Sequence, residues 1–509
     1  MIAPLTPLDF LARSASVYRD SIAVVDGGRR FTYAEFDRRT AQLASALRAL
    51  GVMPGDRVAV MALNGVAPLE AHFGPMRIGA VLVMLNTRLQ AGEIEWILRH
   101  SGAKVLIVDP QLRELAASAG VPHVVDDYQS FLASAQPCES VPVADENACI
   151  AVNYTSGTTG FPKGVMFSHR GAWINSAGEI IEYGLNSNSV YLWTLPMFHC
   201  NGWCFTWAVT AVGGRHICLP RPDPAEALRL IESEGVTHLC GAPVVVASLA
   251  ACCADRGIRL SRPLHIVTAG AAPPPAVIRA AEQMGARISH AYGLTETYGP
   301  MTVCAWKSEW DSLPAAERAQ IKARQGVPYL VAGTDLRVVD SEMRDVPCDA
   351  QTIGEVLMRG NNVMLGYYAN PEATAECFAG GWFHSGDLAV VHPDGYIEIR
   401  DRKKDIIISG GENISSIEVE KVLADHPAVA EAAIVAAPDE KWGEVPKAFV
   451  GLKPGAPATV EDLQEWCRAR LAHFKCPKYF EFGTLPRTAT GKIRKNELRS
   501  RARREESVT

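Results

Sequence analysis

The sequence lacks an apolar run of the length that a membrane-spanning helix needs, which is about 20 residues. Its first residues do not show a basic segment followed by a continuous apolar stretch, as a secretory signal would. The 13 cysteines form no Cys-x-x-Cys pair, and an odd, scattered set is more typical of reduced thiols than of a disulfide framework. The final residues also differ from a Ser-Lys-Leu peroxisomal signal. We therefore expect a cytoplasmic protein without stable insertion into a membrane.

Basic residues do not gather into a stripe, and the formal net charge is -6. This balance argues against a nucleic-acid-binding protein. We interpret one basic group near the C-terminus as a solvated tail, and it consists of Arg499, Arg501, Arg503 and Arg504. His199, Cys200 and Cys204 match no usual zinc spacing and have no second ligand pair, so we do not expect these side chains to bind a metal.

What the chain does have is enough apolar sequence for more than one core. With 509 residues, 48% hydrophobic and 21% charged, it is typical of a globular protein with two to four domains or subdomains. Thr32 to Glu35 is a capping box, and it should begin a helix that ends at Gly51. Apolar strand segments follow at 58–61, 81–84 and 104–108. The alternation predicts an α/β fold with stacked, mostly parallel sheets.

The later part of the chain has a different pattern. Residues 354–398 contain short, glycine-rich strand segments, which are typical of a small barrel-like subdomain. A strand at 406–408, a capping box at 415–418 and a helix from 460 to about 471 predict a small α+β domain. We predict an N-terminal domain at 1–401 and a C-terminal domain at 402–509.

The most informative segment runs from Tyr154 to Gly164 and reads Tyr-Thr-Ser-Gly-Thr-Thr-Gly-Phe-Pro-Lys-Gly. Its glycines allow backbone amides to approach phosphate oxygens, its hydroxyls add donors, and Lys163 supplies a positive charge. It is not a Walker motif, because Pro162 precedes the lysine and Gly164 follows it. The segment predicts an ATP site outside the P-loop class.

Four further motifs follow this loop in order, and together the five resemble the adenylate-forming superfamily of acyl-CoA synthetases, nonribosomal adenylation domains and beetle luciferases. The four are Tyr292-Gly293-Leu294-Thr295-Glu296-Thr297, Ser385-Gly386-Asp387, Asp401-Arg402-Lys403-Lys404-Asp405 and the segment from Pro486 to Lys492. The resemblance extends from about Phe31 to Arg494 and is strongest to synthetases for medium-chain or aromatic acids. It implies a mobile C-terminal lid and an AMP-forming acid–thiol ligase that uses ATP, Mg²⁺ and coenzyme A.

Such a ligase activates a carboxylate, which is a poor acyl donor at neutral pH. Attack of the carboxylate on the α-phosphorus of ATP gives an acyl-adenylate and pyrophosphate, and a thiol then displaces AMP. The transition state gathers negative charge on phosphate oxygens, so the protein must supply cations and hydrogen-bond donors.

The resemblance implies a role for each motif. The residues that would hold the β- and γ-phosphates are Thr155, Ser156, Gly157, Thr158, Thr159 and Lys163. Thr295 would bond the α-phosphate and Glu296 would bind Mg²⁺. The adenine would lie beside Tyr292 and a wall of small residues, which are Gly270, Ala271, Ala272 and Gly293. Asp387 and Arg402 would contact the ribose. Arg402 could also form an ion pair at the domain boundary, and the two roles do not exclude each other.

In the C-terminal domain, the resemblance makes Lys492 the catalytic lysine. A lysine with its ordinary pKa of about 10.4 is a cation at neutral pH, so it would bridge the substrate carboxylate and the α-phosphate rather than act as a base. Lys404 falls at the hinge position, where the backbone would turn between the two steps. Gly410 and Gly411 would let a pantetheine arm pass.

The resemblance places the acyl pocket at His199, Asn201 and Trp203. His199 would gate the pocket sterically, although a role as a base for the thiol stays open. Trp203 could line the cavity or belong to the core. No aspartate stands at an obvious place to hold an α-ammonium group, which argues against an amino-acid substrate. The resemblance implies a hydrophobic acid, medium-chain, aromatic or bulky, and a role in fatty acid metabolism.

Three alternatives remain at this point. The enzyme could load a carrier protein, which no fused domain supplies, or it could be a specialist for one half-reaction, such as thioesterification of a supplied acyl-adenylate. It could also bind nucleotide without turnover, against which Lys492 and Glu296 argue. A homodimer is possible by family analogy only.

Overall fold

The computed structural model describes residues 3–117, 120–155, 162–331, 333, 335–410, 412–487 and 493–504, without the side chains of Asn413 and Arg504. Contacts divide the chain into two compact units. The first unit covers Met1–Leu336 and Met358–Phe383, and the second covers Arg337–Leu357 and His384–Thr509. The second unit thus includes residues on both sides of position 401, and a functional boundary at 401–402 stays a prediction.

The first unit contains a seven-stranded sheet, counted over the described residues, with the order β18-β8-β7-β4-β3-β5-β6. Its centre is parallel, whereas β8 pairs antiparallel with both β7 and β18. The strands are β3 (Arg57–Met61), β4 (Val81–Met84), β5 (Ala103–Val108), β6 (His123–Val125), β7 (Cys149–Thr155), β8 (Lys163–Ser168) and β18 (Gly366–Tyr367). The apolar segments expected at 58–61, 81–84 and 104–108 are therefore buried strands, and their side chains form one core with α4.

A second sheet has nine strands in the described part of the unit, in the order β15-β14-β13-β12-β11-β9-β10-β1-β2. The strands from β1 to β13 in this order pair in parallel. Their bounds are β1 (Ile22–Asp26), β2 (Arg29–Thr32), β9 (Val190–Trp193), β10 (Arg215–Cys218), β11 (His238–Gly241), β12 (Leu264–Thr268), β13 (Ala286–Leu294), β14 (Gly299–Val303) and β15 (Val327–Pro328). The predicted α/β fold with mostly parallel sheets is confirmed.

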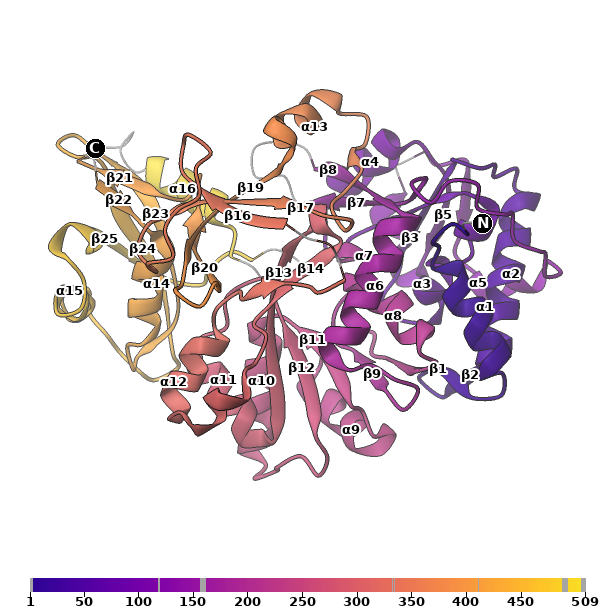
Figure 1. The fold of residues 1–509 in the computed structure, drawn as a ribbon, viewed down its shortest axis with the longest axis horizontal. Helices are drawn as coiled ribbons and strands as arrows, with labels where there is room; N and C mark the ends of the chain where they lie inside the picture. Colours follow the sequence, from indigo (N-terminus) through magenta and orange to yellow (C-terminus); the bar gives the residue numbers. More distant parts are fainter. Residues whose placement is uncertain are drawn as a thin grey trace. The chain divides into compact units, whose positions relative to one another are not determined.

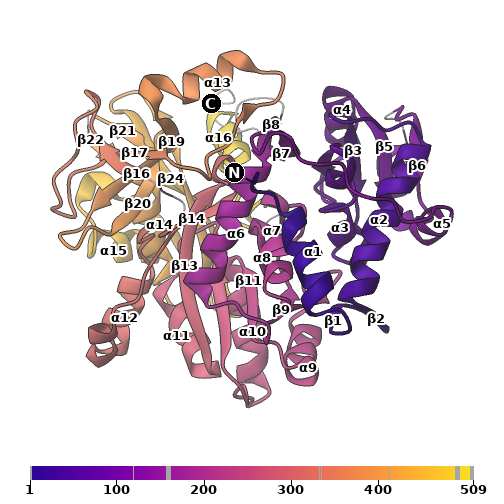
Figure 2. The same ribbon diagram turned by 45° about the vertical axis from the view of Figure 1, so that its right-hand side comes forward.

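Helices cover both sheets of the first unit. Figure 1 shows α9, α10 and α11 along the nine-stranded sheet, and Figure 2 shows α2, α4 and α5 around the seven-stranded one. The helices are α1 (Leu8–Val17), α2 (Tyr33–Ala49), α3 (Val66–Ala71), α4 (Ala91–Ser101), α5 (Tyr128–Ala133), α6 (His169–Tyr183), α7 (Cys200–Trp203), α8 (Phe205–Ala211), α9 (Pro224–Glu234), α10 (Pro243–Asp255), α11 (Pro275–Met284), α12 (Ala315–Lys322) and α13 (Pro371–Cys377).

The capping box predicted for α2 is confirmed. The Thr32 side chain accepts from the Glu35 amide at 3.2 Å, and the Glu35 carboxylate accepts from the Thr32 amide at 2.8 Å. These two bonds satisfy amides that have no partner inside the helix. The helix ends as expected before Gly51, which has a φ of 78°.

The second unit contains two further sheets. The glycine-rich strands form the order β16-β17-β19-β20, and another sheet has the order β22-β21-β24-β23 with β25 beside β24. The strands are β16 (Asp335–Val339), β17 (Gly354–Arg359), β19 (Phe383–Val391), β20 (Ile397–Arg402), β21 (Ile407–Ser409), β22 (Glu412–Ile414), β23 (Val429–Asp439), β24 (Gly443–Leu452) and β25 (Tyr479–Phe482). The helices are α14 (Ser416–Ala424), α15 (Val460–Arg468) and α16 (Lys495–Arg504).

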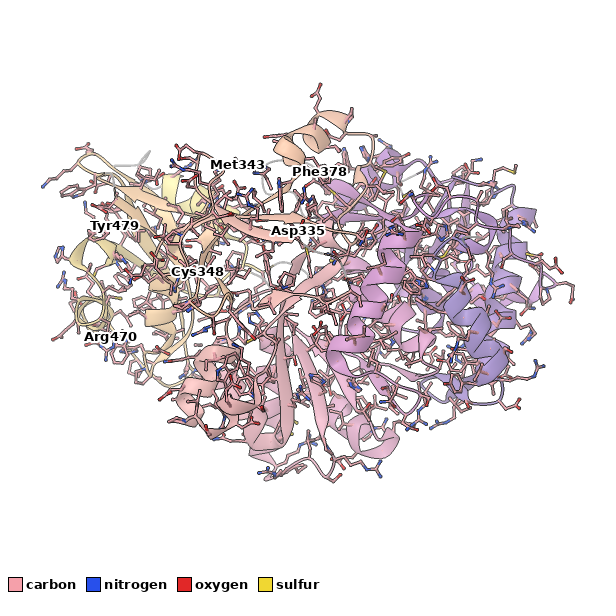
Figure 3. The ribbon with its side chains drawn as sticks, viewed as in Figure 1. Asp335, Met343, Cys348, Phe378, Arg470 and Tyr479 are labelled. Carbon is pink, nitrogen blue, oxygen red and sulfur yellow. The ribbon has the colours of Figure 1, made fainter. Side chains whose placement is uncertain are left out.

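Apolar side chains from both faces of the C-terminal sheet form two cores. One includes Val419 and Leu463, and the other includes Phe449 and Leu498. Leu498 belongs to α16, so α16 packs on the sheet. On the other side, Figure 3 places Arg470 beside α15, where its guanidinium lies 3.4 Å from the centre of the Trp466 ring.

The expectation of a solvated basic tail was wrong for Arg499. This residue lies within α16 and its guanidinium bonds Asp405 at 2.5 Å. The apolar residues Leu498 and Ala502 hold the helix against β23 and thereby bring Arg499 close to that carboxylate. In the described part of the chain, no helix is long and apolar enough to cross a membrane.

Candidate functional site

The ends of the predicted phosphate loop lie opposite each other on two strands. Thr155 on β7 is the register partner of Lys163 on β8, and the Thr155 hydroxyl donates to the Lys163 carbonyl at 3.4 Å. Ser156, Gly157, Thr158 and Thr159 lie outside the described residues. The antiparallel pairing therefore anchors both ends of the loop on the seven-stranded sheet.

Lys163 and Glu296 contact the same tyrosine. The Lys163 ammonium lies 4.8 Å from the centre of the Tyr367 ring, and the Tyr367 hydroxyl donates to Glu296 Oε1 at 2.8 Å. The Met364 amide also donates to the Glu296 carbonyl at 2.8 Å. Burial, reinforced by the negative charge of Glu296, raises the pKa of Tyr367, so its hydroxyl stays protonated and remains a donor. The cluster joins a cation, a hydroxyl and a carboxylate at one place.

Sequence reasoning missed Tyr367. No motif marks it, and it stands 71 positions from Glu296. Its place depends on the pairing of β18 with β8, in which Tyr367 is the register partner of Val165. The strand β18 is only two residues long, Gly366–Tyr367, and so short a segment does not predict a partner strand from the sequence.

Thr295 and Glu296 stand in a tight turn between β13 and β14. The turn is a short 3₁₀ helix at Thr295–Thr297, closed by the Tyr298 amide on the Thr295 carbonyl at 3.1 Å. The Cys200 thiol donates to Thr295 Oγ1 at 3.4 Å. Because that oxygen accepts from a thiol, the Thr295 hydroxyl proton is available to a bound acceptor such as a phosphate oxygen.

The small residues predicted near the adenine follow neighbouring parallel strands. Thr268 at the end of β12 is the register partner of His290 on β13. Residues 270–272 continue from β12, whereas Tyr292 and Gly293 lie at the end of β13. The two segments therefore leave the same edge of the sheet, which is where ligands bind in open α/β sheets.

Gly293 stands at a position that only glycine fits. The register between β13 and β14 shifts between Tyr292 and Gly293. A Cβ atom at Gly293 would lie 1.8 Å from the Gly299 carbonyl oxygen. The two backbones can approach this closely only without a side chain.

The predicted acyl-pocket segment forms a left-handed turn. Five consecutive residues have φ between 46° and 63°, namely Cys200, Asn201, Gly202, Trp203 and Cys204. Such a turn costs roughly 1–2 kcal/mol for each residue with a side chain. Its contacts offset part of this cost: the Asn201 amide donates to Asn153 Oδ1 at 3.2 Å, and the Cys204 thiol donates to the Tyr298 carbonyl at 3.6 Å.

Within this turn, the Asn201 side chain is completely buried, and neither its Nδ2 nor its Oδ1 has a hydrogen-bond partner in the described protein. A buried amide without partners is costly, so a water molecule or a polar ligand group would stabilise it. Trp203 is also buried and lies close to Gly299, while its ring centre is 6.3 Å from that of His199. Trp207 belongs to the core, and its indole N–H donates to the His72 carbonyl at 3.3 Å.

The two residues predicted to contact ribose are neighbours in the second unit. Asp387 on β19 is the register partner of Arg402 on β20, and their side chains form an ion pair at 3.3 Å. Asp387 is 5% exposed, and its amide donates to Ser385 Oγ at 3.0 Å. The ion pair that we expected as a structural role for Arg402 is therefore present.

Lys404 follows this pair in a turn that the Asp405 amide closes on the Arg402 carbonyl at 2.8 Å. Part of the Lys404 side chain is exposed, but loss of water around its ammonium, with Arg402 and Arg499 nearby, lowers its pKa to about 8.

Gly410 has a φ of 58°, and a Cβ there would lie 2.7 Å from the Trp442 ring. Gly411 lies outside the described residues.

Lys492 also lies outside the described residues, but both ends of its segment are described. Arg487 and Ile493 form an antiparallel bridge, and the Arg494 amide donates to the Pro486 carbonyl at 2.8 Å. Arg487 pairs with Glu431 of β23. The segment that carries Lys492 therefore begins and ends at one place on the C-terminal sheet.

We predict that Gly293→Ala destabilises the first unit. The added Cβ would meet a backbone oxygen, and such overpacking costs about 1–3 kcal/mol. The thermal unfolding midpoint, measured by circular dichroism, should fall. Gly92→Ala is a matched control, because a Cβ there meets nothing within 4 Å. Equal midpoints for both variants would contradict the steric role of Gly293.

A second prediction concerns Lys404. The pKa of Lys404 in the folded protein, about 8, is below the ordinary value of about 10.4. Between these two pH values the unfolded chain therefore binds more protons than the folded chain. Lys404 therefore disfavours folding when protonated, and its contribution to stability rises between about pH 8 and about pH 10. The unfolding midpoint of the natural protein should rise relative to Lys404→Met over this range. Lys403→Met is the control, and a difference independent of pH would contradict the shift.

Comparison with known proteins places these features in a family. The model for "AMP-binding enzyme" matches residues 11–368, and the model for "AMP-binding enzyme C-terminal domain" matches residues 418–492. The 4-hydroxybutyrate–CoA ligase 2 of Metallosphaera sedula is 46% identical over 99% of this chain and 96% of its own. The acetate–CoA ligase CCL3 of Humulus lupulus is 46% identical over 98% and 95%.

Solved structures agree with this assignment. The anthranilate CoA ligase AuaEII, in complex with anthranoyl-AMP, has a TM-score of 0.89 and 28% identity over 100% of this chain and 99% of its own. The o-succinylbenzoate CoA synthetase of Bacillus subtilis, with its acyl-adenylate, has a TM-score of 0.86 and 27% identity over 98% of both chains. The chain therefore belongs to the AMP-binding enzyme family, the adenylate-forming superfamily that its motifs resemble, and is an AMP-forming acid–CoA ligase.

Proposed function

We propose that this enzyme converts a short aliphatic carboxylic acid into its CoA thioester through an acyl-adenylate. The observation that carries the proposal is the cluster of Lys163, Tyr367 and Glu296 beside Thr155, which supplies the cation, donor and carboxylate that ATP chemistry requires. The acid class rests on relatives named for 4-hydroxybutyrate, acetate, butyrate and 2-methylpropanoate. The unpartnered amide of Asn201 also suits a small, partly polar acid or a water beside it.

In this proposal the first unit binds the phosphates and the acid, and two residues of the second unit contact the ribose. Lys163 and the loop before it hold the β- and γ-phosphates, and the Thr295 hydroxyl donates to the α-phosphate. Tyr367 keeps the Glu296 carboxylate oriented. Asp387 accepts from the ribose hydroxyls, and Arg402 keeps that carboxylate in place. Donors placed where charge develops lower the barrier more than donors that must reorganise.

Magnesium fits the donor set of this site. Mg²⁺ prefers oxygen ligands and commonly combines one carboxylate with phosphate oxygens, and Glu296 offers such a carboxylate with one oxygen already positioned by Tyr367. When bound, the ion would neutralise phosphate charge. Glu296 is therefore the residue that would hold it.

The second unit supplies the catalytic cation. Lys492 bridges the carboxylate of the acid and the α-phosphate during adenylate formation. After pyrophosphate leaves, the lid at 402–509 turns about Lys404, and the segment with Gly410 and Gly411 admits the pantetheine thiol. A loop that carries a required charge for one step and withdraws for the next separates the two half-reactions.

A second candidate for the acid is a hydrophobic one, medium-chain, aromatic or bulky. Small residues at 270–272 and 293 leave space that favours it. A carrier-protein acceptor and a single half-reaction also remain as alternatives. We further propose a cytoplasmic location, a place in fatty acid metabolism and a homodimer. Three relatives from Arabidopsis thaliana are named as peroxisomal.

The acid class can be tested by product analysis. The enzyme is mixed with ATP, Mg²⁺, CoA and one acid from a panel of acetate, butyrate, 2-methylpropanoate, 4-hydroxybutyrate, octanoate and benzoate, and acyl-CoA is quantified by mass spectrometry. We expect the highest kcat/KM for one of the four short acids. A preference for octanoate or benzoate would favour the second candidate, and adenylate without acyl-CoA would point to another acceptor.

The role of Lys492 is tested by separating the half-reactions. Lys492→Ala should reduce acyl-adenylate formation by roughly 10²–10³-fold, as loss of one electrostatic contact to a transition state does. Thioester formation from supplied acyl-adenylate should change little. Lys453→Ala is the control, because its ammonium is exposed and bonds only the Pro427 carbonyl among the described contacts. Equal loss of both half-reactions would show that Lys492 has another role.

A further inference from the structure

Residues on the two sides of Lys404 are joined by direct contacts inside the second unit. Before this position, β20 carries Glu398 and Asp401, and after it comes α14. Lys421 of α14 pairs with Glu398 at 3.0 Å, and the Ser416 amide at the start of α14 donates to Asp401 Oδ2. Ser415 donates its hydroxyl to the Arg400 carbonyl at 2.5 Å. The end of β20 thus lies against the first turn of α14.

These contacts suit a helix N-terminus. Ser415 is the N-cap of α14, and its Oγ also accepts from the Glu418 amide at 3.1 Å. A carboxylate near the first amides of a helix is stabilised by their partial positive charge. Asp401 has this position and is 1% exposed, so β20 supplies part of the cap of α14.

Lys495 adds a cation to this group, with a side chain that is 17% exposed. It begins α16, and its ammonium donates to Ser416 Oγ at 2.6 Å and pairs with Glu420 at 2.7 Å. Burial raises the pKa of Asp401 and Glu420, and the charge of Lys495 opposes that effect for both carboxyls. Burial would lower the pKa of Lys495, but Glu420 and Asp401 raise it above its ordinary value. The lysine therefore favours the charged forms of the two carboxyls, and the carboxylates favour the charged form of the lysine.

A rotation of the lid about Lys404 is incompatible with these contacts. Glu398, Arg400 and Asp401 lie before the hinge, whereas α14 and α16 turn with the lid. Every bond between the two sets must break when the lid turns, because hydrogen bonds and short ion pairs do not survive displacements of several ångströms. The contacts can exist in only one of the two lid orientations that the proposed reaction uses.

We propose that Glu398, Arg400 and Asp401, together with Ser415, Ser416, Lys421 and Lys495, form a latch that stabilises one lid orientation and sets the balance between the two half-reactions. The inference rests on the proposed two-step function. Lys495 is a positioning residue in this latch, three positions after Lys492 in the sequence. Its two bonds hold the start of α16, and so one end of the segment that carries the catalytic lysine, against α14. Across Lys404, its charge acts on the Asp401 carboxylate, which caps α14.

The latch is tested by substitutions at its two lysines. Lys421 pairs with Glu398 across Lys404, and the charge of Lys495 acts on Asp401 across it. Lys495→Met and Lys421→Met keep most of the side-chain volume and remove the charge. The two rates to measure are pyrophosphate release with ATP and the best acid of the panel without CoA, and thioester formation from the synthetic adenylate of that acid with CoA. We expect the two rates to change in opposite directions, with their ratio altered by roughly fivefold or more, as in other couplings between conformational states.

Lys475→Met is the matched control. Lys475 pairs with Glu418 through two bonds of 2.8 Å, and both residues lie after the hinge. This variant loses an ion pair of the lid without weakening the latch, so the ratio of the two rates should stay at the natural value. Lys495→Arg, which keeps the charge, should restore the ratio. Parallel losses of both rates, or an unchanged ratio in both latch variants, would overturn the proposal.

A readout independent of catalysis separates failure of the latch from failure of the proposed function. Hydrogen exchange of the amides at 398–405 and 415–418 should become faster in Lys421→Met and Lys495→Met but not in Lys475→Met. Lys421 is 47% exposed, so its variant folds even if Lys495→Met does not. Unchanged exchange would overturn the latch, whereas absence of acyl-adenylate with the natural protein would overturn the proposed function alone.

Discussion

Parallel strand pairing in the nine-stranded sheet is the constraint on which the candidate nucleotide site depends. Because β12 and β13 run side by side in register, the segments that leave their carboxyl ends emerge at the same edge. One segment carries the small residues 270–272, and the other carries Tyr292 to Glu296. Without this pairing, two segments about twenty positions apart in the chain would have no reason to meet.

A second pairing completes the cation and carboxylate cluster. The antiparallel partners β7 and β8 hold Thr155 opposite Lys163, and β18 joins the far side of β8. Tyr367 therefore reaches both the Lys163 ammonium and the Glu296 carboxylate. The tyrosine thus links the lysine and the carboxylate at one place.

The strained segments of the first unit lie beside the same turn. Cys200 and Cys204, at the two ends of the left-handed turn, donate to Thr295 and to the Tyr298 carbonyl, and Gly293 passes very close to Gly299. Strain of this kind persists only where surrounding contacts overdetermine the backbone, and it gathers at functional sites. The second unit shows another arrangement, in which hydrogen bonds and ion pairs link β20 to α14, and α14 to α16.

The sequence by itself determined the family, the α/β alternation and the order of the motifs, because glycines, hydroxyls, capping boxes and apolar periods are local signals. It also marked Thr295, Glu296, Asp387 and Arg402. Only the tertiary structure decided that Tyr367 joins Lys163 to Glu296, that Arg499 pairs with Asp405 rather than lying in solvent, and that Lys495 bonds Ser416 and Glu420. These contacts join positions 71 and more apart in the chain, and their geometry follows from sheet pairing and helix packing, which no local pattern encodes.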